Sequence, residues 1–270
     1  MAPAILFLAI AAASGAGVPS VHSRWAAAPI AVDGRADEWA GDGLIHDEKS
    51  GTDFAFRNDG RDIYVLAVVN NAEAAKALRA SGLKIFGRPG RRGSTASGVL
   101  FVARDVSAEA YIGWEVSQGA VLTEAEKAEL RKAGRRELHL AFAVGATGSI
   151  FGPIGRAARG LNPEFAVAER EGRTTCEFRI PLAPPDQVPG GIGAEPGGTL
   201  RLSFDWGGGE SREMSTPASA ATQTSRSGYV SGTGRTWSQE FLDTFDSMSK
   251  PSSNAKKYSF SVEVKLAEPE

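Results

Sequence analysis

The sequence predicts an all-β protein, an antiparallel two-sheet β-sandwich that carries two short surface helices. Several segments alternate apolar and polar side chains, which is the period of strands with one solvated face. The chain also contains 32 Gly residues, and turn-like clusters separate many of the alternating segments. Only two segments have a composition that is typical of helices. Strands of this kind belong to antiparallel sheets that pack face to face.

The apolar run AILFLAIAAA near the N-terminus, followed by SGAGVPS, is typical of a signal peptide. We expect residues 1–23 to form this signal, with cleavage between 16 and 23, although no Lys or Arg precedes the run. No Cys follows it that could carry a lipid anchor, and no later apolar stretch is long enough for membrane insertion. The product is therefore expected in the periplasm or secreted, with residues 24–270 as a single domain.

The stretch IAVDGRADEWAG, residues 30–41, predicts how the chain enters this domain. Ile30 and Val32 alternate as a short strand, and Asp33-Gly34 is a strong turn signal. Asp37 and Glu38 suit the first turn of a short helical segment. Trp39 would then pack as an apolar plug in the core.

Alternation predicts strands along the rest of the chain. The ranges are 53–57, 62–69, 98–105, 110–117, 137–144, 164–170, 174–182, 199–206 and 258–266. The first two flank the turn NDGR and predict a hairpin, and 98–105 with 110–117 predicts a second one.

The two predicted helices are 71–81 and 123–136. The second begins with a capping box, in which Thr123 is the N-cap and Glu126 is the third helical residue. Both are interpreted as surface connections of a β domain.

Two irregular stretches are candidates for loops. Residues 207–239 are rich in Gly, Ser and Thr without any hydrophobic period, and such long loops are usually functional or disordered. Residues 87–98 carry Arg88, Arg91 and Arg92, which would favour either an acidic ligand or simply a solvated turn.

Composition and motifs exclude several functions. Thirty basic and 32 acidic residues give a net charge of −2, so nothing indicates nucleic-acid binding. Cys176 is the only cysteine and alternates with Phe178 and Ile180, which predicts a buried small side chain and no disulfide. The chain contains no nucleophile elbow, zinc motif, phosphate loop or dinucleotide fingerprint. We therefore predict a protein that is not an enzyme, while a glycosidase-type pair of carboxylates stays open.

The motifs IAVDGRADEW, DIYVLAVVNN, CEFRIPL and LRLSFDW follow one another in an order and spacing that resembles carbohydrate-binding module family 9-like proteins, of the DOMON-like β-sandwich group. The resemblance covers nearly all of the mature chain. It implies a β-sandwich that binds a carbohydrate or glycan without a catalytic step, and it leaves bound calcium possible.

Members of that family that bind sugar hold it between two Trp side chains. One clamp Trp is missing here, since residues 83–105 contain none. Trp237 is placed like the other, before the final strand, and its Gly, Thr and Ser neighbours suit a stacked sugar ring. A Trp that caps the end of the sandwich is the alternative. Tyr229, Arg235 and Arg88 are the further candidate ligand-binding residues, whereas Trp39, Trp114 and Trp206 are assigned to the core.

Two other functions remain open at this point. Some members of the wider group bind haem b for electron transfer, for which Met214, Met248, His46 and His139 would supply axial ligands. The missing clamp Trp would instead favour a structural sandwich that binds a protein partner and no small ligand.

Overall fold

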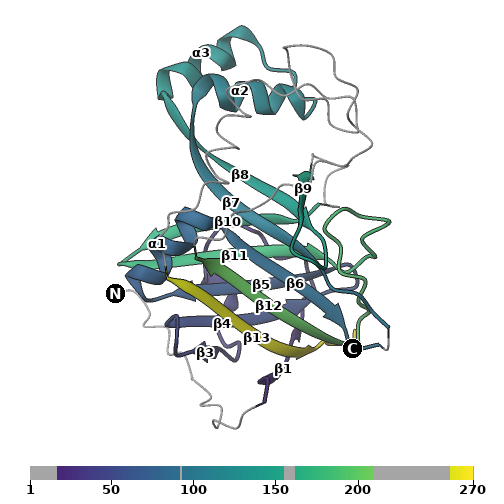
Figure 1. The fold of residues 1–270 in the computed structure, drawn as a ribbon. Coiled ribbons are helices and arrows are strands. Elements are labelled where there is room, and N and C mark those ends of the chain that lie inside the picture. Colours follow the sequence, from purple (N-terminus) through teal and green to yellow (C-terminus); the bar gives the residue numbers. More distant parts are fainter. Residues whose placement is uncertain (1–16, 92, 155–161, 209–255, 270) are drawn as a thin grey trace.

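The chain folds into two facing β-sheets, which confirms the predicted fold class (Figure 1). The computed structural model describes residues 17–91, 93–154, 162–208 and 256–269. The seven-stranded sheet runs in the order β1 (Ser20–His22), β13 (Lys257–Lys265), β12 (Thr199–Gly207), β6 (Leu83–Pro89), β7 (Ser97–Ser107), β8 (Arg135–Val144) and β9 (Ile150–Pro153). The six-stranded sheet contains β10 (Glu164–Arg170), β11 (Arg173–Pro181), β5 (Asp62–Val69), β4 (Thr52–Asn58) and β2 (Arg24–Trp25), with β3 (Ile45–Asp47) also paired to β4.

Aromatic rings fill the space between the sheets. Phe54 and Phe204 pack with ring centroids 4.7 Å apart, and Phe101 and Phe178 with centroids 5.0 Å apart. Cys176 lies in the same core and is fully buried, as its alternation predicts. Burial raises the pKa of its thiol to about 12, so it behaves as a small apolar side chain.

Both predicted helices are present. Helix α1 (Ala72–Ser81) begins at the N-cap Asn71, and α3 (Glu124–Ala133) begins with the predicted capping box. Helix α1 is more than a surface connection: Leu78 is buried in the main core, and the indole Nε1 of Trp206 donates to the carbonyl of Ala74 at 3.2 Å. No helix in the described ranges is long and apolar enough to cross a membrane.

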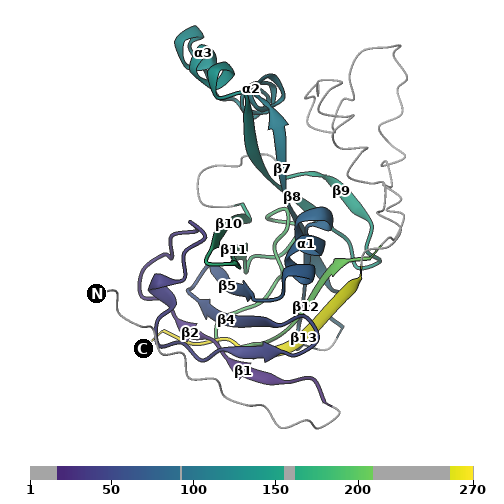
Figure 2. The same cartoon turned by 90° about the vertical axis from the view of Figure 1, so that its left-hand side faces the viewer.

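The predicted strand at 110–117 is wrong, because these residues lie in a third helix, α2 (Ala108–Ser117). Ser107 caps it by accepting from the backbone N–H of Ala110 at 3.1 Å, and β7 pairs with β8 instead. Positions 110 and 114 are one helical turn apart as well as in phase along a strand, so the apolar pattern fits both structures. Figures 1 and 2 show α2 and α3 beyond the two sheets, at the far end of the β7–β8 ribbon.

The opening stretch also differs from its prediction. Residues 30–32 form no strand; instead the segment crosses the outer face of the six-stranded sheet. Its Asp37–Trp39 turn is the predicted short helical piece, a 3₁₀ helix, and Trp39 is completely buried. Trp39 packs with Ala55 and Leu66 from the sheet, so this face is covered by a third layer of chain.

One carboxylate holds this layer in place. Oε2 of Glu177, on β11, accepts the backbone N–H groups of Asp33, Gly34 and Arg35 at 3.0, 2.7 and 3.2 Å. Its Oε1 accepts the indole Nε1 of Trp39 at 2.6 Å. Burial raises the pKa of Glu177, and the hydrogen bonds from Trp39 and the three amides oppose that rise.

Glycine is required where this segment approaches the sheet. Gly34 has φ +79°, and a Cβ there would lie 3.0 Å from the backbone nitrogen of Ala168. At the Asp33-Gly34 turn the outer layer thus lies directly against the backbone of β10.

Replacing the acceptor should loosen the outer layer. We expect Glu177→Gln to lower the free energy of unfolding by about 1–3 kcal/mol, because the amide nitrogen cannot accept from the buried donors. Urea denaturation measures the change. Glu263→Gln, on the exposed side of β13, serves as a control and should change it by less than about 0.5 kcal/mol. Equal stability of both variants would contradict the role given to Glu177.

Candidate functional site

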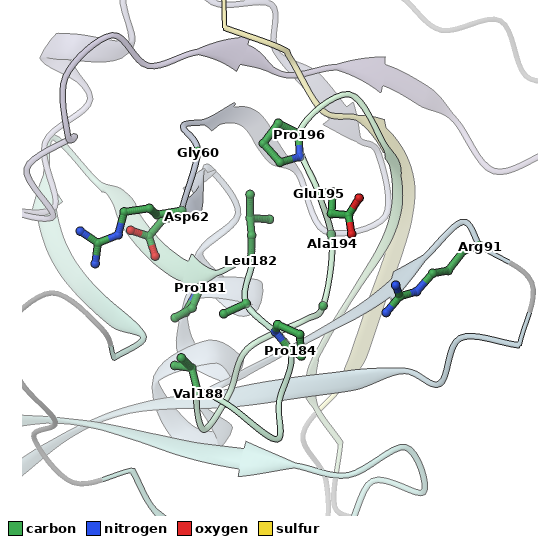
Figure 3. Close-up of a pocket in the computed structure, with 13 residues that line it drawn as sticks. Gly60, Asp62, Arg91, Pro181, Leu182, Pro184, Val188, Ala194, Glu195 and Pro196 are labelled. Carbon is green, nitrogen blue, oxygen red and sulfur yellow. The ribbon is translucent and has the colours of Figure 1, made fainter.

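A cavity of about 310 Å³ opens at one end of the sandwich (Figure 3). The turn between β4 and β5 contributes Gly60, Arg61 and Asp62, and the loop between β6 and β7 contributes Arg91. The end of β11 and the loop that follows it supply the remaining wall, which is mainly apolar and is formed by Pro181, Leu182, Ala183, Pro184, Val188, Gly193, Ala194, Glu195 and Pro196.

Backbone hydrogen bonds fix the wall after β11. Leu182 donates to the carbonyl of Arg61 at 2.8 Å, which joins the wall to the β4–β5 turn. The chain then folds back, so that Ile192 donates to Pro181 at 3.1 Å and Ala194 to Leu182 at 2.9 Å. These bonds fix the shape of the cavity wall, as in preformed binding sites.

Asp62 is the buried polar group of this cavity. It lies at the start of β5, opposite Pro181 in the sheet register, and only 6% of the residue is exposed. Its carboxylate accepts no hydrogen bond and forms no ion pair within the part of the chain that the structure describes. The nearby hydroxyl of Tyr64 donates to Asp59 instead, at 2.9 Å.

The electrostatic environment of Asp62 is unusual for an aspartate. Burial raises the pKa of its carboxyl to about 6, and the charges of Asp59 and Glu164 act in the same direction. The guanidinium groups of Arg179 and Arg61 partly offset this rise. The carboxylate is therefore ionised at neutral pH but poorly solvated.

The other charged groups lie across the cavity. Figure 3 shows Glu195 and Arg91 on the side opposite Asp62, with Leu182 and Pro184 between the two sides. The site thus combines hydrogen-bond acceptors, a guanidinium donor and apolar faces, the combination that fixes the orientation of small polar ligands.

The sequence-predicted residues are only partly described. Arg88 is exposed on β6, opposite Arg201 of β12, and does not line the cavity, whereas its neighbour Arg91 does. Trp237, Tyr229 and Arg235 lie outside the described residues, so their roles stay predictions.

The segment that carries Trp237 joins the sandwich at its other end. It leaves β12 after Gly207 and returns to β13 at Lys257, and these two residues pair with each other. Arg88 lies near the opposite end of the same ladder, since β12 pairs along β6 from Trp206 with Leu83 to Leu200 with Pro89.

The predicted core Trp residues are buried. Trp39, Trp114 and Trp206 all lie in apolar clusters, Trp114 from helix α2 rather than from a strand. Trp25, which the sequence did not assign, is half-buried on β2.

The two candidate haem ligands that the structure describes, His46 and His139, lie on different sheets. His46 lies on β3 and bonds Asp53 through Nδ1 at 2.7 Å, while His139 lies on β8 of the other sheet and bonds Glu137 through Nε2 at 2.6 Å. Met214 and Met248 lie outside the described residues. No group of three or more His, Cys, Asp or Glu side chains suited to a metal ion occurs among the residues that the structure describes.

Sequence reasoning missed this cavity. Its signal is the stretch APPDQVPGGIGAEPGG directly after the strand CEFRIPL, a Pro- and Gly-rich loop whose length alone marks it as a candidate. Nothing local connects that loop to Asp62, more than 100 positions earlier in the chain, because the sheet register brings the two together.

The chain matches no protein-family profile and no curated protein sequence. Among solved structures it is similar to a carbohydrate-binding module family 9 (CBM9) from Caldicellulosiruptor kristjanssonii in complex with glucose. The identity is 12%, 93% of this chain and 98% of that chain are covered, and the TM-score is 0.36. A CBM9 from the same organism in complex with cellotriose aligns at 13% identity over 92% of this chain and 94% of that chain, with a TM-score of 0.35. The superpositions are loose, so the function proposed for this chain rests on its own residues.

Asp62 should make stability depend on pH. Its pKa of about 6 in the folded protein lies above the value of about 3.9 for an unfolded Asp. Between these values the folded state binds more protons, so the contribution of Asp62 to the free energy of unfolding falls as pH rises from 4 to 6.

We therefore expect Asp62→Asn to be more stable than the wild type at pH 7, with the difference shrinking towards pH 4. Urea denaturation at both pH values measures this. Asp186→Asn, exposed in the loop after β11, is the matched control and should show no such trend. An Asp62→Asn protein less stable than the wild type at pH 7 would contradict the electrostatic description of the site.

Proposed function

We propose that the protein is an exported carbohydrate-binding β-sandwich without catalytic activity. A sugar would be held by aromatic stacking and by hydrogen bonds from loops at the ends of the sandwich. The proposal joins the motif order of the sequence, which resembles family 9-like modules, to the polar cavity at the loop end of the two sheets.

The observation that carries the proposal is the composition of that cavity. Sugars present C–H faces and hydroxyl groups together, so a site for them needs apolar surface beside hydrogen-bonding groups. Leu182 and the surrounding prolines offer the first, and Asp62, Glu195 and Arg91 offer the second. A volume of about 310 Å³ lies at the lower end of the range of small-molecule pockets, so the cavity suits one ring rather than a long chain.

Aromatic stacking is a separate part of the proposal and is assigned to Trp237, with Tyr229 and Arg235 as neighbouring contacts, on a segment that leaves the sandwich at the end opposite the cavity. An indole ring gives a large, flat apolar face and a polar N–H edge, which matches the two kinds of surface on a sugar. This part of the proposal comes from the sequence alone.

Export is proposed with cleavage near Ala16. Ser20–His22 forms β1, which pairs in parallel with β13, and the Ser23 hydroxyl accepts from the backbone N–H of Ala267 at 2.9 Å. Cleavage after residue 23 would remove these contacts, whereas cleavage near 16 keeps them. The mass of the exported chain decides between the two positions.

A glycan array followed by calorimetry tests the function with the chain from residue 17 onward. We expect the wild type to bind at least one glycan, and Trp237→Ala tests the stacking part of the proposal by losing about 2 kcal/mol or more of binding free energy. Phe151→Ala is the matched control, because Phe151 is an aromatic side chain 46% exposed on β9. If the wild type binds no glycan on the array, the proposed function is contradicted.

A further inference from the structure

The unpartnered carboxylate of Asp62 is the feature of the cavity that most needs a ligand. More than nine-tenths of the residue is buried, it lines the cavity, and no described group donates to its oxygens. Figure 3 shows Asp62 on the side of the cavity away from Glu195 and Arg91, and Pro181 and Leu182 line the cavity with it. An ionised carboxylate that is largely shielded from water and has no protein donor is poorly solvated, and a ligand that supplied donors would improve its solvation.

Two neighbouring residues, Arg179 and Asp59, form hydrogen bonds with groups other than Asp62. Arg179 on β11 donates through Nη2 to the carbonyl of Asn162 at 3.1 Å and pairs with Glu164 of β10 at 3.0 Å. Asp59 in the β4–β5 turn accepts from two backbone amides as well as from the hydroxyl of Tyr64. Neither Arg179 nor Tyr64 therefore donates a hydrogen bond to Asp62, although the charge of Arg179 acts on it and Nε of Arg179 is buried without a partner among the described residues.

The balance of charge around Asp62 is negative. The groups that face it are the carboxylates of Asp59 and Glu164 and the guanidiniums of Arg61 and Arg179. With Asp62 itself this makes three carboxylates against two guanidiniums, so a cationic group is favoured next to the Asp62 oxygens over a neutral or anionic one.

We propose that the cavity takes an amino sugar with a free primary amine, whose ammonium group donates to the Asp62 carboxylate. This inference rests on the proposed carbohydrate-binding function and names its substrate class. The ring would lie along Leu182 and the prolines, and its hydroxyl groups would reach Glu195 and Arg91 on the far side.

Charge distinguishes this ligand from other sugars. A hydroxyl group can also donate to a carboxylate, but a hydrogen bond between an ammonium and a carboxylate is charge-assisted and roughly twice as strong as a neutral one. N-acetylation removes the positive charge while it keeps the ring, so the acetylated sugar is a close comparison.

Calorimetry at pH 7 compares three oligosaccharides of equal length: glucosamine, N-acetylglucosamine and glucose oligomers. We expect the glucosamine oligomer to bind at least about tenfold more tightly than the other two. Asp62→Asn should lose this preference, and Asp186→Asn should keep it. Lowering the pH to 4.5 should also abolish the preference, because Asp62 then becomes protonated. Circular dichroism establishes that each variant is folded.

The outcomes separate this inference from the function on which it rests. Equal affinity for the three oligomers, or a preference for glucosamine that survives in Asp62→Asn, would overturn the amino-sugar inference and leave carbohydrate binding intact. Binding of none of the three, together with an empty glycan array, would overturn the proposed function as well.

Discussion

The buried carboxylate of Glu177 is the constraint on which the arrangement of the outer layer depends. It gathers four donors, three from consecutive backbone amides and one from the indole of Trp39. This explains why a turn with Gly34 is followed, five positions later, by a Trp: both must reach one carboxyl group on β11. The segment then keeps the apolar outer face of the six-stranded sheet dry, which a two-layer sandwich alone would leave exposed.

The same strand connects this layer to the candidate site. β11 pairs with β5 from Thr174 to Pro181, so the register that places Glu177 opposite Leu66 also places Pro181 opposite Asp62. Beyond Pro181 the chain turns back on itself through Leu182 and forms the wall of the cavity. The position of Asp62 against that wall is therefore set by the sheet and not by the loop alone, as expected for a preorganised site.

The alternation of apolar and polar residues predicted most of the strands, and composition and capping residues predicted helices α1 and α3. Alternation located β12 and β13 because each has one face in the core, and a capping box located α3. The predicted strand around Trp114 was wrong, because residues that alternate along a strand also fit a helix when Ser107 supplies an N-cap. The sequence pattern could not predict the cavity, nor the burial and raised pKa of Asp62, because both depend on residues that only the sheet register brings together. Trp237, the strongest sequence-based candidate, remains a prediction.

The most direct test of where a sugar binds is a titration of the isotope-labelled protein with a glucosamine oligomer, followed by backbone amide chemical shifts. Binding at the proposed cavity predicts shifts concentrated at Gly60 to Asp62, at Leu182 and Ala183, and at Gly193 to Glu195, from three segments that meet only there. Shifts confined to other parts of the chain, or none at saturating sugar, would contradict the assignment of this cavity as a carbohydrate site.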